Sequence, residues 1–560
     1  MRPEGSLRWS SRFASALIGI VTAALLLRTV WVHYWPISIE SEGVYYARIA
    51  ENLLSGRGYV AMREVGKQFL YPPLYPIFIA LFSIFTSNSE LAGRLVSATF
   101  GSLWIVPLML IARNAFDEVS GLVTGILVAL SPAAIAISGT VQSEPLYLAW
   151  QATGIYFALR VWPDRAKAPC YLAGLSFGLA YLVRPEAVIY VTLTALFILL
   201  SGRGGLSLRF ISVARFALAF ALTILPYVTW LSIQTGGLRL EAKSISNYAE
   251  ARAWAQHLPP GEIFFAVDPQ LKNVGLSNQS DLAMMHQTKL STRAMFWLAL
   301  HNGEDNIRRV FSLLLKARLF GGVFFVLLVG MGAFSHSSDR DALVRRSYLF
   351  AAFLLAFVPL LSLHAFHDRF IFPFLTVLFP IAGSGLVRLF EVLKAILVTL
   401  TTGAPRYAIA CTILAAGLAA GYAATCLVVE SHSFLHLETD LRLPEQDITI
   451  QRGERVVRTV GQTIRDFNVT HALVMEGEPI IAFYAGASDW PLPYCGEETA
   501  LRYIAKTNPD FIVLRSRNAD VFPYVGQWVS SGIPDKRAEL VSTVGSPDGK
   551  VLVYRWHKGN

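Results

Sequence analysis

The chain has little charge, few cysteines and no glycine-rich phosphate loop, and each shortage excludes a class of protein. Only 16% of its 560 residues are charged, against about a quarter in soluble domains, while 54% are hydrophobic. The four cysteines fit neither a disulfide framework nor a metal-binding motif. The net charge of +9 comes without a basic cluster that has interleaved aromatics, so we exclude nucleic acid as a partner. This composition indicates a polytopic membrane protein.

Long apolar segments recur along the first three quarters of the chain. A helix needs about 20 apolar residues to span the hydrocarbon, and about eleven segments approach that length. They fall at 14–32, 94–112, 120–138, 143–161, 170–184, 186–201, 211–233, 317–335, 347–365, 370–388 and 407–430. The shorter segment 74–85 begins at a proline-rich stretch, so we expect it to lie along the membrane interface. We interpret 14–32 as an uncleaved span, because no small-residue cleavage pattern precedes Trp31.

Basic residues predict the orientation of these spans in the membrane. Lysines and arginines gather in alternate connections, which the positive-inside tendency places in the cytoplasm. They include Arg113, Arg160, Arg165, Lys167, Arg203, Arg209, Arg340, Arg345, Arg346, Arg388, Lys394 and Arg406. The N-terminus is then cytoplasmic, and the loops 33–93 and 234–316 lie outside a cell membrane, inner or plasma, together with the polar tail.

The chain divides into two predicted domains. Residues 1–430 form a transmembrane domain, and residues 431–560 form an extracytoplasmic α/β domain. In the tail, the patterns predict helices near 453–467, 478–485 and 497–507, and strands at 471–475, 511–514, 538–544 and 550–556. No glycine-rich loop follows a strand there, so the tail is not predicted to bind a nucleotide. In the outer loop, short helical patterns cover 247–256 and 280–299.

The first outer loop carries an acidic pair, Glu40 and Glu42, at the start of a helical pattern. The pair could be solvated, or it could cap the helix that begins near Val44. An ionised carboxylate at a membrane face could instead accept a proton from an attacking hydroxyl or amine. Glu42 is the better candidate for this base, because it lies four residues before Tyr46 at the turn into the helix.

Two short motifs place further charges at the outer ends of spans. Gln142-Ser143-Glu144-Pro145 could be a helix cap, or it could add a second acid to the same cavity. Arg184-Pro185-Glu186 joins two spans with almost no loop, and its two charges could simply pair with each other.

A third cluster, His364, His367, Asp368 and Arg369, crowds the mouth between two further spans. The histidines lack a convincing third metal ligand. Arg369 suits a phosphate, because a planar guanidinium can make paired hydrogen bonds to phosphate oxygens. Acids and cations on one face suit sugar transfer from a lipid phosphate, which is a good leaving group and needs no general acid.

In this order, the motifs resemble those of GT-C fold glycosyltransferases, in the bacterial branch related to protein O-mannosyltransferases and the aminoarabinose transferase of lipid A. The resemblance covers about residues 14–390. It rests on the acidic loop with Tyr-Tyr-Ala-Arg-Ile-Ala-Glu-Asn-Leu-Leu-Ser-Gly-Arg-Gly-Tyr, then Pro-Pro-Leu-Tyr-Pro, Arg94-Leu95-Val96-Ser97-Ala98, Ser143-Glu144-Pro145-Leu146, Arg184-Pro185-Glu186 and His367-Asp368-Arg369-Phe370. The family more often has aspartate in the first loop. Its aminoarabinose enzyme also has a lysine just before the proline motif. In this chain Pro72 occupies that position, and the nearest lysine is Lys67.

The resemblance implies a membrane enzyme that moves a sugar from a polyprenyl-phosphate donor to a lipid, glycan or protein acceptor on the outer face, with inversion. It makes Glu42, or Glu40, the catalytic group. The predicted substrate-binding residues are Tyr46, Lys67, Glu144, Arg184, Glu186, His367 and Arg369. We expect no cofactor, with a divalent cation as the alternative. The rival interpretation is a secondary transporter or flippase, whose ionisable residues would lie near mid-membrane.

Overall fold

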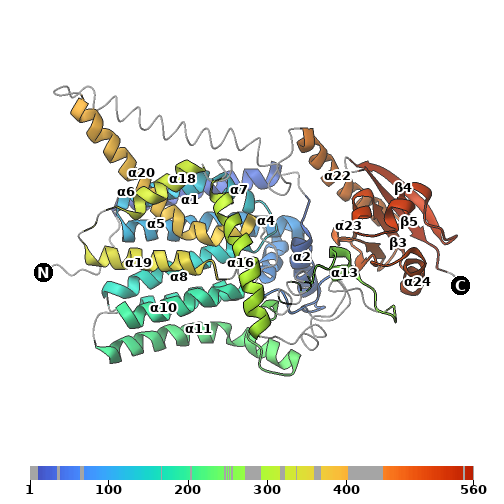
Figure 1. Cartoon of the computed structure of the whole chain (residues 1–560), viewed down its shortest axis with the longest axis horizontal. Coiled ribbons are helices and arrows are strands. Elements are labelled where there is room, and N and C mark those ends of the chain that lie inside the picture. The colour runs from blue at the N-terminus through green and yellow to red at the C-terminus, as the bar shows by residue number, and fades with distance from the viewer. Residues whose placement is uncertain are drawn as a thin grey trace.

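A computed structural model shows a helical bundle with a small α/β domain at one end (Figure 1). It describes residues 10–34, 38–62, 68–164, 167–201, 205–244, 256–271, 292–315, 322–335, 339–358, 368–400, 445–546 and 549–558, together with Ser337 and a few single positions between 245 and 255. The boundary predicted at 430 and the last predicted span, 407–430, lie outside the described residues.

The helices of the bundle lie between Ser11 and Leu400. In chain order they are α1 (Ser11–Tyr34), α2 (Ser41–Leu54), α3 (Leu74–Thr86), α4 (Ser89–Leu103), α5 (Ile105–Ala115), α6 (Glu118–Leu130), α7 (Pro132–Ile137), α8 (Glu144–Asp164), α9 (Lys167–Tyr181), η1 (Pro185–Ala187), α10 (Val188–Ser201), α11 (Leu206–Thr235), α16 (Thr292–Leu315), α18 (Val323–Ala333), α19 (Arg340–Leu355), η3 (Asp368–Ile371) and α20 (Phe372–Leu400). Most predicted spans therefore form helices near their predicted positions. Several of these helices, among them α8, α10, α11 and α19, run side by side, and α16 crosses them (Figure 1).

Four described helices are long and apolar enough to cross a membrane: Ser11–Tyr34, Ser89–Ala115, Leu206–Thr235 and Arg369–Ala395. Large aliphatic side chains cover the outside of α11, where Leu218, Leu222 and Leu225 are 53%, 59% and 54% exposed. Such a surface is stable against lipid and not against water. The chain is a membrane protein, and the predicted total of about eleven spans stays a prediction.

The predicted span 120–138 is wrong as a single helix. The structure ends α6 at Leu130 and starts α7 at Pro132, because proline has no N–H to continue the helical hydrogen bonds. Arg28 of α1 is fully buried beside this break. Its guanidinium donates to the carbonyl oxygens of Val128 at 3.2 Å and Ala129 at 3.3 Å, and to the hydroxyl of Ser138 at 3.2 Å. Arg28 thus satisfies carbonyls that the broken helix leaves without partners.

In the described part of the tail, helices accompany a five-stranded mixed sheet of order β2-β1-β3-β5-β4, and the predicted domain bounds 431–560 stay a prediction. β1 pairs in parallel with β2 and β3, and β5 pairs antiparallel with β3 and β4. The elements are α22 (Glu445–Asp466), β1 (Leu473–Glu476), α23 (Ile480–Ala485), β2 (Ser488–Pro491), α24 (Glu497–Thr507), β3 (Phe511–Arg515), η5 (Ser516–Asp520), α25 (Val525–Ser531), β4 (Ala538–Ser546) and β5 (Gly549–Trp556). The sequence had not predicted β2 or α25.

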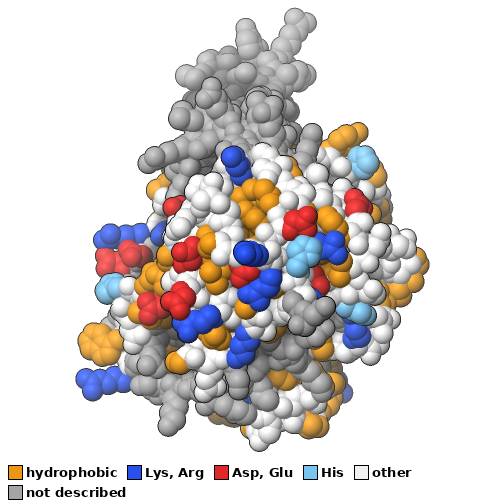
Figure 2. Space-filling view, turned by 90° about the vertical axis from the view of Figure 1, so that its right-hand side faces the viewer, with side chains coloured by type: hydrophobic (Ala, Val, Ile, Leu, Met, Phe, Trp, Pro, Cys, Tyr) orange, Lys and Arg blue, Asp and Glu red, His pale blue; other side chains and the backbone are white. Residues whose placement is uncertain are grey.

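Contacts from several segments join this domain to the rest of the chain. In α2, Arg48 donates to the carbonyl of Ala487 at 3.2 Å. In the part of the outer loop that contains α13 (Pro260–Phe265), the carbonyl of Phe265 accepts from the Tyr494 N–H at 2.6 Å. At the start of α4, Glu90 pairs with Arg458 of α22 at 2.8 Å. The outward face of the domain mixes acidic and basic side chains without a field of one sign (Figure 2).

Candidate active site

Arg369, in η3, lies among three carboxylates, two from the start of α2 and one from the start of α8. Its Nη2 is 2.5 Å from Glu42 Oε2, its Nε is 3.6 Å from Glu144 Oε1, and its Nη1 is 3.9 Å from Glu40 Oε2. The structure thus brings the predicted base and the predicted phosphate-binding arginine into direct contact. The juxtaposition depends on folding, because 327 residues separate positions 42 and 369.

Arg184 contacts the same oxygen of Glu144 that Arg369 approaches. Its Nη1 donates to Glu144 Oε1 at 2.5 Å, and its Nη2 is 3.5 Å from Glu186 Oε1. The sequence left open that Arg184 and Glu186 simply pair with each other. They do pair, but the shorter contact is with Glu144, so Glu144 holds both arginines of the cluster.

Glu42 is also held by Tyr46, one helical turn further along α2. The Tyr46 hydroxyl lies 3.1 Å from Glu42 Oε1 and 3.2 Å from Ser143 Oγ. Burial by itself would raise the pKa of Glu42, but Arg369, Lys243 and Arg184 outweigh it and lower the pKa well below its usual value. Glu42 is therefore ionised at neutral pH, as a proton acceptor must be.

The start of α2 aims the two acids at the cluster. Glu40 occupies the N-cap position, but its side chain makes no capping hydrogen bond and instead accepts one from Gln142. Glu42 is in the first turn, where the helix dipole favours a negative charge. A side chain at Gly43 would meet the carbonyl of Val141 at 2.8 Å, so glycine permits α2 to approach the segment before α8. Because the Glu40 side chain makes no capping hydrogen bond, helix capping does not explain the presence of an acid at this position.

The segment 139–142 before α8 contributes a residue that was not among the predicted site residues. Gln142 accepts from Arg369 Nη1 at 2.6 Å while it donates to Glu40, so it links the two. Its backbone carbonyl accepts from Ser97 at 3.1 Å, and Ser97 in turn bonds the Tyr75 hydroxyl at 2.9 Å. The signal was present in the sequence, because Gln142 belongs to the Gln142-Ser143-Glu144-Pro145 motif.

Two buried carboxylate oxygens in the cluster have no hydrogen-bond partner among the described residues, Glu144 Oε2 and Glu186 Oε2. A buried acceptor without a hydrogen-bond partner costs about 1–3 kcal/mol of folding free energy, so a hydrogen-bond donor of a ligand would bind favourably there. Sugar hydroxyls are such donors. The cluster thus offers guanidinium groups for an anion and carboxylates for hydroxyls within one site.

Two of the predicted site residues, Lys67 and His367, lie outside the described residues, as does His364. The other seven predicted residues belong to the cluster: Glu40, Glu42, Tyr46, Glu144, Arg184, Glu186 and Arg369. Within the described ranges, no group of three or more His, Cys, Asp or Glu side chains is arranged to hold a metal ion. The expected absence of a cofactor, with a divalent cation as the alternative, stays a prediction.

Comparison with known proteins identifies relatives of the fold. The family described as dolichyl-phosphate-mannose-protein mannosyltransferase matches residues 71–230. ArnT from Cupriavidus metallidurans in the apo state has a TM-score of 0.55 at 14% identity, over 97% of this chain and 98% of that one. The same protein bound to undecaprenyl phosphate gives 0.52 at 14% identity, over 96% and 97%.

An archaeal enzyme has the same fold. The oligosaccharyltransferase AglB from Archaeoglobus fulgidus, in complex with an inhibitory peptide and a dolichol-phosphate, has a TM-score of 0.55 at 14% identity, over 90% of this chain and 69% of that one. No curated protein sequence matches the chain. The predicted GT-C fold and the resemblance to the mannosyltransferase and ArnT group are confirmed, and together they support a membrane glycosyltransferase.

Proposed function

We propose that the protein transfers a sugar from a polyprenyl-phosphate donor to an acceptor on the extracytoplasmic face of the cell membrane, with inversion at the anomeric carbon. The observation that carries the proposal is the 2.5 Å contact between Arg369 and Glu42, at the ends of helices beside the α/β domain. It joins a phosphate-binding group to a proton acceptor. Two solved structures with this fold, of ArnT and AglB, hold undecaprenyl phosphate and dolichol-phosphate, which supports a lipid-linked donor.

In this mechanism, Arg369 and Arg184 bind the donor phosphate and stabilise the charge that develops on it. Glu42 takes the proton of the acceptor hydroxyl as the acceptor oxygen attacks the anomeric carbon. The bond from that carbon to the phosphate oxygen breaks on the opposite side, and polyprenyl phosphate leaves with the electron pair. Glu144 and Glu186 hold sugar hydroxyls through their free oxygens.

Donor binding and base strength are coupled in this site. Arg369 cannot make its full set of hydrogen bonds to a phosphate while Glu42 is bound to its Nη2. The donor must therefore displace that carboxylate at least in part. A carboxylate released from its cation, buried and next to a phosphate, has a higher pKa. Glu42 therefore becomes a stronger base when the donor is bound, and it stays ionised and paired when the site is empty.

The placement of charges supports the proposed orientation. Helices α4 and α5 together run from Ser89 to Ala115, about 40 Å at 1.5 Å per residue, so their ends lie on opposite sides of a bilayer. At the far end, Arg345 and Arg346 donate to the carbonyls of Asn114 and Ala115 at 2.8 and 3.0 Å. The positive-inside tendency assigns that end to the cytoplasm, and the acidic cluster and the α/β domain to the outside.

The rival function is secondary transport or flipping of a lipid-linked substrate. A transporter of this kind binds its substrate near mid-membrane on interrupted helices. Here the ionisable residues gather where α2, α8, η1 and η3 begin, beside the extracytoplasmic domain, and this favours transfer.

The test is a transfer assay with membranes that contain the full-length protein. Polyprenyl phosphates that carry different radiolabelled sugars are incubated with membranes from cells with and without the gene, and the label is followed into lipid, glycan and protein fractions. We expect one donor to yield labelled acceptor in a reaction that needs Glu42. Flux of a lipid-linked sugar across sealed vesicles, without transfer in any fraction, would reverse the ranking of the two functions.

A further inference from the structure

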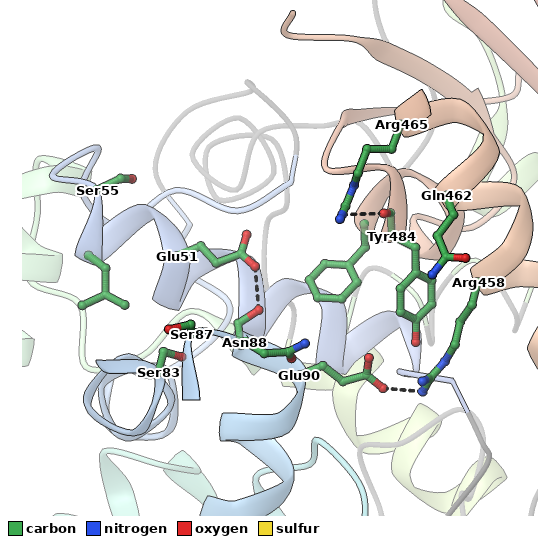
Figure 3. A pocket seen from close by; sticks show the side chains of 13 residues that line it. Glu51, Ser55, Ser83, Ser87, Asn88, Glu90, Arg458, Gln462, Arg465 and Tyr484 are labelled. Carbon is green, nitrogen blue, oxygen red and sulfur yellow. Dashed lines mark hydrogen bonds and ion pairs between the residues drawn. The ribbon is translucent and has the colours of Figure 1, made fainter. Parts of the chain in front are cut away.

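A cavity lies between the bundle and the α/β domain (Figure 3), and none of the residues of the acidic cluster lines it. Its volume is about 700 Å³, within the range of roughly 300–1,000 Å³ typical of small-molecule sites. One wall comes from the end of α2 and the turn between α3 and α4. The other comes from α22 and α23.

The walls of this interdomain pocket are polar and electrically balanced. Serine hydroxyls and the amides of Asn88 and Gln462 line it, beside two aromatic rings, Phe483 and Tyr484. Its two acids and two arginines are engaged within the protein. Arg458 pairs with Glu90 at 2.8 Å, Ser89 donates to Glu51 at 2.5 Å, and Arg465 donates to the carbonyl of Tyr484 at 2.6 Å.

This chemistry selects the class of ligand. Arg458 is already paired with Glu90, and Glu51 also lines the pocket, so an anionic ligand such as a phosphate would meet two carboxylates and only one other guanidinium, that of Arg465, which donates to a backbone carbonyl. Hydroxyls and amides can each donate and accept, which matches a ligand with many hydroxyl groups, and the rings offer a flat apolar surface for a sugar face. A neutral saccharide fits these walls better than an acidic or apolar molecule does.

The pocket is also connected to the candidate active site. The Tyr484 hydroxyl accepts from the backbone N–H of Ile39 at 3.0 Å, directly before Glu40. Glu90, which holds Arg458, also pairs with Arg94 at 2.7 Å, and Arg94 donates to the carbonyl of Gly139 at 3.3 Å. Two of the segments that carry the acidic cluster, those that lead into α2 and α8, are thus anchored to walls of the pocket.

We infer that the interdomain pocket binds a neutral saccharide, and that this saccharide is part of a glycan acceptor. The second half of the inference rests on the proposed function. Glu51 follows Glu42 by nine residues of α2, about 13 Å along the helix axis. A saccharide in the pocket therefore lies a few sugar units from the hydroxyl that would react at Glu42, and it orients the acceptor from a distance.

The first experiment measures binding directly, without donor. Maltotriose, mannotriose, cellotriose and N-acetylchitotriose are titrated against the full-length protein in nanodiscs by saturation-transfer NMR, with a phosphorylated sugar as the anionic comparison. The variant Gln462→Trp fills the pocket from an exposed position, and Gln527→Trp is the matched control at an exposed position of α25. We expect a neutral trisaccharide to bind and Gln462→Trp to weaken it at least tenfold, with no change in Gln527→Trp.

Absence of binding by all four trisaccharides, stronger binding of the phosphorylated sugar, or equal binding by Gln462→Trp would overturn the saccharide site.

The second experiment identifies the source of the saccharide by transfer kinetics with glycan acceptors. For Gln462→Trp, we expect a KM for acceptor at least tenfold higher at nearly unchanged kcat and donor affinity. An unchanged KM would overturn the acceptor assignment alone. Failure of the wild-type protein to transfer any sugar would instead refute the proposed function.

Discussion

Replacing Glu42 with glutamine should lower the rate of sugar transfer and raise the affinity for the donor. Glutamine keeps the size of the side chain but cannot accept the acceptor's proton, and a general base typically contributes about 10²–10⁴ in rate. We therefore expect kcat for transfer to fall by at least about 100-fold in Glu42→Gln.

Donor binding should become tighter in the same variant. In the wild-type protein, Arg369 Nη2 is 2.5 Å from Glu42, so a donor phosphate competes with a carboxylate that is already in place. The pair is partly exposed, with side chains 22% and 16% accessible, which puts its strength between surface and fully buried pairs. If removing the competing charge saves about 1.4 kcal/mol, the affinity for donor rises about tenfold.

The measurement is a titration of undecaprenyl phosphate, together with single-turnover transfer, in nanodiscs. The matched control is Glu40→Gln, because Glu40 is 3.9 Å from Arg369 and competes less. Its donor affinity should change less than that of Glu42→Gln. Transfer by Glu42→Gln within twofold of wild type would refute the base, and weaker donor binding would refute the competition.

Three further predictions test the site and the two domains. Arg369→Lys should weaken undecaprenyl phosphate binding about tenfold or more, because lysine lacks the planar fork, and equal titrations would contradict this. In the α/β domain, burial and the nearby Asp489 raise the pKa of Glu476 well above its usual value, so its contribution to stability is present at low pH and is lost as pH rises through the raised value. Asp489→Asn should flatten this dependence in melting curves recorded against pH, and an unchanged slope would exclude the coupling. Arg28→Met should lower the free energy of unfolding by about 2 kcal/mol or more, since it leaves carbonyls of α6 unsatisfied; a thermal melt equal to wild type would argue against that role.

The sequence predicted which charged residues form the cluster better than it predicted which of them contact one another. Apolar length located α1, α8, α9 and α11, and the charges at the ends of spans identified the residues that meet. Which acid faces which arginine depends on helix packing, and no local pattern carries that information. Gln142 lies in a motif that the sequence singles out, but its role was missed because a neutral amide shows that role only once Glu40 and Arg369 lie on either side of it.

The errors in the fold have local causes. The span 120–138 was predicted whole because its apolar length outweighed Pro132, and the structure shows that the proline decides. Strand β2 (Ser488–Pro491) was missed because four residues that include aspartate and proline do not look like a strand. It forms because β1 supplies a parallel neighbour along its whole length.

The buried guanidinium of Arg28 sets an order for biogenesis. About a hundred residues separate Arg28 from the α6 carbonyls that it satisfies, so the first helix reaches the translocon long before its partners are made. Until they arrive, an isolated cation at that depth is costly in lipid. The nascent first helix must therefore wait in a hydrated or protein-lined setting, and its final insertion is coupled to the arrival of the helix that breaks at Pro132.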